Sequence, residues 1–138
     1  MDWFECNQKR IVKEVSIDTD LIESLKKTSI NKLNSENKLE LDDITASSKL
    51  SLAYDSLREL LEALALKNKF KIYNHDCFTP FLKEILKENE KAEEFDELRK
   101  IRNNINYYGK DISVTEAKEV IERIKKLREE ILGLLNKS

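Results

Sequence analysis

Residues 113–135, SVTEAKEVIERIKKLREEILGLL, place apolar side chains three or four positions apart from end to end. That spacing puts the apolar side chains on one face of an α-helix and most charged side chains on the other. Ser113 and Glu116 match a capping box, in which each side chain binds the backbone N–H of the other residue, so we expect the helix to begin there. The apolar face is longer than a small bundle needs, which favours a homodimer.

The same spacing recurs in three other parts of the chain. It predicts long helices over residues 18–34, 42–68 and 91–108, and a short helix near residues 78–85 that follows a loop. The side chains expected to face inward on the three long helices are Leu21, Ile22, Leu25, Ile30, Leu33, Leu50, Tyr54, Leu57, Leu60, Leu61, Leu64, Phe95, Leu98, Ile101, Ile105 and Tyr108. No segment alternates convincingly with period two, so we expect no sheet.

These elements predict an all-α fold, an up-and-down four-helix bundle with one extra short helix over residues 18–138. Short connections between long amphipathic helices favour antiparallel neighbours. Residues 1–17 are expected to form an irregular N-terminal arm. The chain has 138 residues with two glycines and one proline, which agrees with one domain of long helices and few turns.

Composition narrows the class of protein. The net charge is −2, so the chain as a whole has no attraction for nucleic acid or a membrane surface. No run approaches the ~18 apolar residues of a membrane span. Cys6 and Cys77 are too few for a disulfide framework, and we interpret them as intracellular thiols. With one histidine and no metal-ligand spacing we expect no metal and no cofactor, in a cytoplasmic protein.

The most unusual stretch is LRKIRNNINYYGKDIS, residues 98–113, in which a predicted helix ends in polar residues. One arc of this helix, beside the apolar arc, carries Arg99, Arg102, Asn103 and Asn106. Tyr107 lies about 140° from Arg102 around an ideal helix. The two therefore meet at one ligand only if the helix unwinds near Gly109 or a second subunit completes the site.

The chemistry of this arc suits a phosphate or a base. An arginine binds phosphate through two parallel hydrogen bonds, and amides and phenols hydrogen-bond or stack against bases. A structural interpretation stays open, in which Arg102 pairs with a carboxylate while the asparagines and tyrosines finish the helix end. We interpret His75, the single histidine, as a surface or capping residue, because no catalytic partner lies near it in sequence.

Three segments in order resemble one known family. Arg102 and Asn103, then three residues and Tyr107, are similar to the motif of HEPN domains (higher eukaryotes and prokaryotes nucleotide-binding), in which Arg and a polar residue precede a histidine. The segments AYDSLRELLEAL, YNHDCFTPFLKEIL and FDELRKIRNNINYYGKDIS resemble archaeal and bacterial members of that family. The resemblance covers roughly residues 44–136.

The resemblance implies a helical bundle that dimerises and binds a nucleotide or RNA in a toxin–antitoxin or defence module, beside a minimal nucleotidyltransferase. It makes Arg102 the phosphate ligand, with Asn103, Asn106 and Arg99 around it. Tyr107 stands where the family has its catalytic histidine, and a phenol with a pKa of about 10 is a poor base at neutral pH. We therefore expect impaired ribonuclease activity. On the helix at 42–68, Asp55, Arg58, Glu59 and Glu62 form either a solvated ion-pair face or a group in which an acid orients Arg102. The resemblance favours Glu59 and Glu62 for that role.

Two other functions stay open. One is a metal-independent endoribonuclease, a toxin in which Tyr107 or His75 supplies the missing base. The other is a structural helical adaptor whose partner docks on the N-terminal arm or on the last helix. A tyrosine next to the motif is also a candidate acceptor for a nucleotidyl group from a partner enzyme, a role that the resemblance implies.

Overall fold

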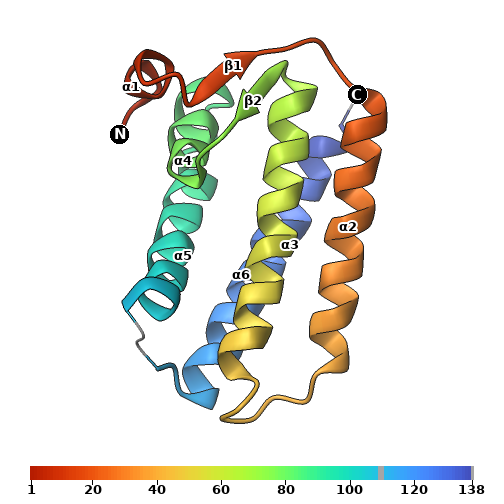
Figure 1. Cartoon of the computed structure of the whole chain (residues 1–138), viewed down its shortest axis with the longest axis vertical. Coiled ribbons are helices and arrows are strands. Elements are labelled where there is room, and N and C mark those ends of the chain that lie inside the picture. The colour runs from red at the N-terminus through yellow and green to blue at the C-terminus, as the bar shows by residue number, and fades with distance from the viewer. Residues whose placement is uncertain (109–110, 138) are drawn as a thin grey trace.

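A computed structural model describes residues 1–108 and 111–137 of the chain, without the side chains of residues 106–108. The prediction of a mostly helical protein is confirmed. Four long helices, α2 (Thr19–Lys38), α3 (Ala46–Lys67), α5 (Asn89–Tyr108) and α6 (Val114–Leu135), follow one another in alternating directions (Figure 1). Within the described residues, none of the helices combines the length and the apolar character needed to cross a bilayer.

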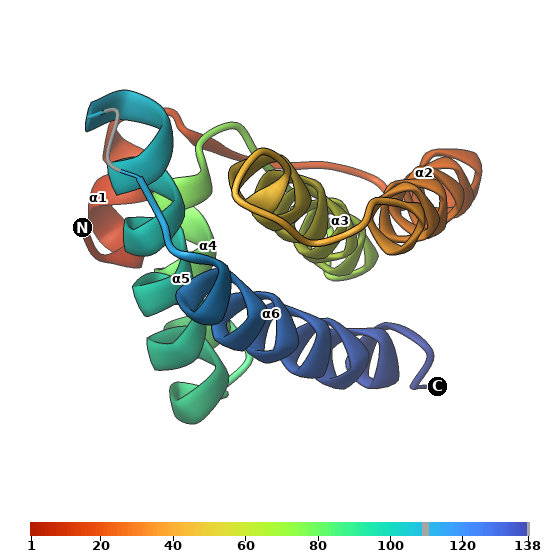
Figure 2. The same ribbon diagram turned by 90° about the horizontal axis from the view of Figure 1, so that it is seen from below.

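The helices α3 and α6 hold the core, and α2 and α5 lie on either side of α3 (Figures 1 and 2). The predicted inner face of α3, from Leu50 to Leu64, is buried, and so is most of the predicted face of α6. Two predicted helix starts are confirmed. Asp18 accepts a hydrogen bond from the N–H of Leu21 at 3.0 Å, and Ser113 accepts one from the N–H of Glu116 at 3.1 Å.

The N-terminal arm is structured, so the prediction of an irregular arm and the prediction of no sheet are both wrong. A short helix, α1 (Trp3–Gln8), leads into strand β1 (Val12–Glu14), which pairs antiparallel with strand β2 (Phe70–Ile72). Each strand has three residues. A segment of this length is too short to display alternation, and its pairing depends on a partner far along the chain.

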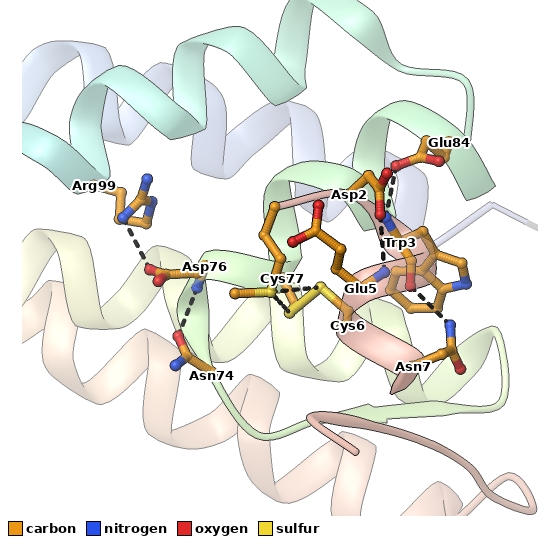
Figure 3. Close-up of a disulfide and its surroundings, with 11 residues drawn as sticks. Asp2, Trp3, Glu5, Cys6, Asn7, Asn74, Asp76, Cys77, Glu84 and Arg99 are labelled. Atoms are coloured by element: carbon orange, nitrogen blue, oxygen red, sulfur yellow. Dashed lines mark hydrogen bonds and ion pairs between the residues drawn. A yellow bond between two sulfur atoms is a disulfide. The ribbon is translucent and has the colours of Figure 1, made fainter. Parts of the chain in front are cut away.

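The interpretation of the cysteines as free thiols is also wrong. Cys6 in α1 and Cys77 form a disulfide with a Cα–Cα distance of 6.1 Å, and both residues are fully buried (Figure 3). Two cysteines cannot make a framework, but they can make one staple when the fold brings them together. Here the pairing of β1 with β2 does so, because each cysteine lies close to one of the two strands in sequence.

The segment between β2 and α5 is less regular than the predicted short helix. A 3₁₀ turn at His75–Cys77 is followed by α4 (Phe78–Pro80) and a π-helical turn at Phe81–Ile85. Trp3 of α1 packs against this segment and β2, with its ring centroid 5.9 Å from Phe81 and 5.1 Å from Phe70. The arm and this segment therefore form one layer over the end of α3.

The predicted inner face of helix α2 is confirmed only in part: Ile22 is buried and Leu25 packs against the core as predicted. Leu21 and Ile30, expected inside, are 37% and 49% exposed, whereas Ser29 and Glu36 are buried. The reason is a polar contact between helices: the hydroxyl of Ser29 donates to the carbonyl oxygen of Ser56 on α3 at 2.7 Å. Buried polar groups require partners, so this contact and its neighbours fix which face of α2 turns inward.

The same contact extends to α6. The guanidinium of Arg128, only 3% exposed, donates from Nε to the Ser56 hydroxyl at 2.7 Å and from Nη2 to the Ser29 hydroxyl at 3.1 Å. One buried cation therefore joins α2, α3 and α6. Burial lowers the pKa of Arg128 from its usual value.

Candidate functional site

Helix α5 directs Arg102 toward α3. Its side chain is 16% exposed, its guanidinium carbon lies 5.1 Å from the ring centroid of Tyr54, and its Nη2 lies 3.9 Å from Oδ1 of Asp55. The aromatic face attracts the cation, and Asp55 attracts it from the side. Arg102 is therefore held between two residues of α3, at the edge of the core.

A carboxylate that contacts Arg102 is thus that of Asp55, which lies one turn before Glu59 and two turns before Glu62. Glu59 is turned toward α2, where its carboxylate contacts Thr28 and Lys32. Glu62 accepts a hydrogen bond from Arg58 at 2.6 Å, and burial raises the pKa of its carboxyl.

Arg99 connects α5 to the segment that follows β2. Its Nη1 donates to Oδ1 of Asp76 at 2.9 Å (Figure 3). Its Nη2 donates to Oδ1 of Asp96, also at 2.9 Å. Its Nε is buried and finds no acceptor among the described residues. Arg99 therefore fixes the position of residues 73–77 relative to α5, and it contributes a second guanidinium near Arg102.

His75 belongs to this cluster, contrary to its interpretation as a surface or capping residue. Its Nδ1 lies 3.5 Å from the hydroxyl of Tyr54, and its half-buried ring packs against Tyr54 and Phe78. Burial, with the positive charges of Arg58 and Arg102, lowers the pKa of His75 to about 4. The imidazole is therefore neutral at pH 7.

A hollow of about 380 Å³ opens beside these residues. Its lining comes from the end of α5 and from the segment after β2, and consists of Tyr73, Asn74, His75, Asp76 and Asn103. The volume falls in the range of about 300–1,000 Å³ that is typical of small-molecule sites. Of the predicted ligand-binding residues, Asn103 thus lines the hollow, whereas its neighbour on α5, Arg102, lies against Tyr54.

Two predicted site residues cannot be placed in this way. The side chains of Asn106 and Tyr107 lie outside the described residues, as do Tyr108's side chain and Gly109, which was predicted to end the helix. The backbone of α5 stays helical through Tyr108. Within one subunit, Arg102 and Tyr107 therefore start from faces of the helix that are about 140° apart.

Three guanidiniums from helices α3 and α5 lie near Tyr54 and affect the pKa of its hydroxyl. The positive charges of Arg102, Arg99 and Arg58 oppose the effect of burial, which raises the pKa of Tyr54 well above its usual value. Tyr54 is therefore a neutral phenol at pH 7. Arg58 also contacts Asp55 at 3.7 Å, and each arginine has at least one carboxylate partner. The site combines arginines, each paired with a carboxylate, with neutral polar and aromatic groups. An anionic ligand with an aromatic part would share the guanidiniums with these carboxylates.

Sequence reasoning missed the part of the site that follows β2. Tyr73, Asn74 and Asp76 form a run of hydrogen-bonding side chains directly after a buried strand residue, Ile72. That run was a usable signal, but nothing in the sequence placed it opposite α5. No family model and no curated protein matches the chain.

Proposed function

We propose that this chain is a HEPN-type, up-and-down four-helix bundle that binds a nucleotide or RNA through the phosphate-binding Arg102. The observation that carries the proposal is the convergence of Arg58, Arg99 and Arg102 around Tyr54 and His75, beside a hollow of about 380 Å³. The order and directions of α2, α3, α5 and α6 support the family assignment.

Phosphate binding requires that Arg102 can exchange or share its contact with Asp55. The Nη2–Oδ1 distance of 3.9 Å is long for an ion pair that includes a hydrogen bond, and both side chains are partly exposed. A pair of this kind contributes little free energy. A phosphate that accepts two parallel hydrogen bonds from the guanidinium forms a stronger contact and can compete with the carboxylate.

The remaining parts of the proposal follow from the resemblance. The chain acts as a homodimer in a toxin–antitoxin or defence module, with a minimal nucleotidyltransferase as its partner protein. A dimer brings a second copy of α5 to the site, which is one way for Tyr107 to approach Arg102. Because Tyr107 replaces the family's histidine, ribonuclease activity is impaired or lost.

Titration with inorganic phosphate and with a short single-stranded RNA tests the proposal, with protein NMR or calorimetry as the readout. Arg102→Ala should weaken both ligands at least tenfold, and Arg102→Lys should restore part of the affinity because it keeps the charge without the planar pair of donors. Lys100→Ala is the matched control, since Lys100 lies on the same helix with its side chain 66% exposed. Equal binding by the wild type and Arg102→Ala, with both folded, would falsify the proposal.

His75 favours a second candidate function, a metal-independent ribonuclease. It is a neutral imidazole that lines the hollow, so it can accept a proton from a ribose hydroxyl in place of the motif histidine, as a weaker base because its pKa is about 4. RNA cleavage without added metal that is lost in both His75→Gln and Arg102→Ala would support this function. Intact RNA after incubation with micromolar protein would count against it.

A further inference from the structure

The hollow has walls unlike those of a second phosphate site. Of the described side chains that line it, those of Tyr73, Asn74 and Asn103 carry hydroxyl or amide groups, His75 is a neutral imidazole at pH 7, and Asp76 is a carboxylate bound to Arg99. Such a surface offers hydrogen bonds and aromatic faces but repels a further anion. It is chemically distinct from the cluster of guanidiniums beside it.

The walls are held in place before any ligand arrives. Ile72 is paired with Val12 in the sheet, and the N–H of Tyr73 donates to the carbonyl oxygen of Ile11 at 2.8 Å. Four residues later, Cys77 is bonded to Cys6 (Figure 3). A wall that is already fixed loses little conformational entropy when it binds a ligand.

Two side chains in this wall have hydrogen-bonding capacity to offer. The amide of Asn103 is half-buried and makes no hydrogen bond with another described residue. The Oδ1 of Asn74 accepts from the N–H of Asp76 at 2.9 Å, so its Nδ2 is the group that remains as a donor. Amides at such positions match the donor and acceptor pattern on the edge of a base.

Tyr73 supplies a stacking surface. Its ring is 57% exposed at the edge of the hollow, and the ammonium of Lys71 lies 5.4 Å from the ring centroid. Lys71 can cover only one face of the ring, and bases stack readily on an exposed aromatic face. The hollow therefore combines a stacking ring, two amides and a neutral imidazole.

From this combination we propose that the hollow is a nucleobase subsite, with Asn103 and Asn74 at the edge of the base and Tyr73 against its face. This inference rests on the proposed function, since Arg102 holds the phosphate of the same ligand. It assigns binding roles to Tyr73 and Asn74, which the family motif does not include.

The test compares ligands that differ only by the base. Wild-type protein is titrated with ribose 5-phosphate and with each of the four ribonucleoside monophosphates. At least one nucleotide should bind about tenfold more tightly than ribose 5-phosphate, which corresponds to about 1.4 kcal/mol. Tyr73→Ala should remove most of that difference while the affinity for ribose 5-phosphate stays the same. Asn103→Ala should also remove most of the difference, because it weakens nucleotide binding more than ribose 5-phosphate binding. Asn104→Ala, an exposed neighbour on α5, is the matched control.

The outcomes separate the subsite from the proposed function. If all five ligands bind equally and Arg102→Ala weakens them all, the phosphate site stands and the base subsite is wrong. The subsite is equally wrong if a nucleotide binds more tightly but Asn103→Ala and Tyr73→Ala keep the whole difference. If Arg102→Ala changes nothing, or if no ligand binds, both proposals fail.

Discussion

Nη2 of Arg102 on α5 lies 3.9 Å from Oδ1 of Asp55 on α3, and this contact connects two helices at the proposed phosphate site. The carboxylate holds the guanidinium but also repels any phosphate that approaches it. The two effects have opposite signs, so a variant can tell which of them dominates.

Asp55→Asn should raise the affinity for inorganic phosphate about three- to tenfold, because it removes one negative charge close to the ligand in a partly exposed site. Glu62→Gln, which removes a carboxylate that contacts Arg58 instead, is the control and should have a smaller effect. Calorimetric titration measures both. Loss of phosphate binding in Asp55→Asn would show that the carboxylate positions Arg102 rather than competes for it.

Tyr54→Leu should reduce the phosphate affinity about two- to fivefold, because a cation–π contact of about 0.5–1 kcal/mol that holds Arg102 is lost. It should also lower the free energy of unfolding by about 1–3 kcal/mol, since the fully buried ring stacks on Phe95. Tyr54→Phe keeps the ring and should keep the phosphate affinity. Denaturant unfolding and phosphate titration measure the two effects. An equal loss of affinity in both variants would assign the role to the hydroxyl instead.

Reduction of the Cys6–Cys77 disulfide should lower the free energy of unfolding. The bond joins residues 71 positions apart, and a loop of that length corresponds to about 4 kcal/mol of chain entropy in the unfolded state. Urea unfolding with and without dithiothreitol measures the change, and the variant Cys6→Ala/Cys77→Ala should not respond to the reductant. Reaction of two equivalents of a thiol reagent with denatured, unreduced protein would contradict the disulfide.

Acidification should destabilise the protein partly through His75. The pKa of His75 is about 4 in the folded state and near 6.5 when unperturbed, so the unfolded state alone takes up the proton between these values. This contribution to stability is complete above about pH 6.5 and is lost as the pH falls toward 4. Arg58 and Arg102 oppose protonation, whereas Asp55 and Asp76 favour it. Thermal melts from pH 7 to 4 should show a smaller loss of Tm in His75→Gln, and parallel profiles would contradict the assignment.

Two substitutions test the buried polar contact among α2, α3 and α6: one removes an acceptor of Arg128, and the other removes Arg128 itself. Ser56→Ala should lower the free energy of unfolding by about 1–3 kcal/mol, because it leaves the buried guanidinium of Arg128 without an acceptor for its Nε. Arg128→Met should be nearly neutral or stabilising, because it removes the buried charge and fills the space. Chemical denaturation measures both, with Ser48→Ala at an exposed position of α3 as the control. A strong loss in Arg128→Met would show that the cation itself stabilises the assembly of the three helices.

The sequence correctly predicted the helix faces that are buried through apolar side chains. The inner faces of α3 and α6 and the starts at Asp18 and Ser113 depend on local spacing and capping, which can be read within one segment. The orientation of α2 could not be predicted in this way. It depends on Ser29, whose partners lie on two other helices.

The same distinction applies to the candidate site: unusual residues within one segment could be found from the sequence, and contacts between distant segments could not. Arg102 and Asn103 were found because their residue types are unusual at the end of a helix. Asp55 and His75 were not assigned their contacts, because these depend on how α3 and the segment after β2 lie against α5. Contacts between distant segments have no signature in a single sequence unless a motif records them.

The pairing of Val12 with Ile72 has a consequence for synthesis on the ribosome. The partner of β1 is made sixty positions later, and at about 5–20 residues per second the nascent arm waits roughly 3–12 s before it can dock. During that interval Trp3, which packs against Phe70 and Phe81 in the folded chain, has no surface to cover it and is available to chaperones.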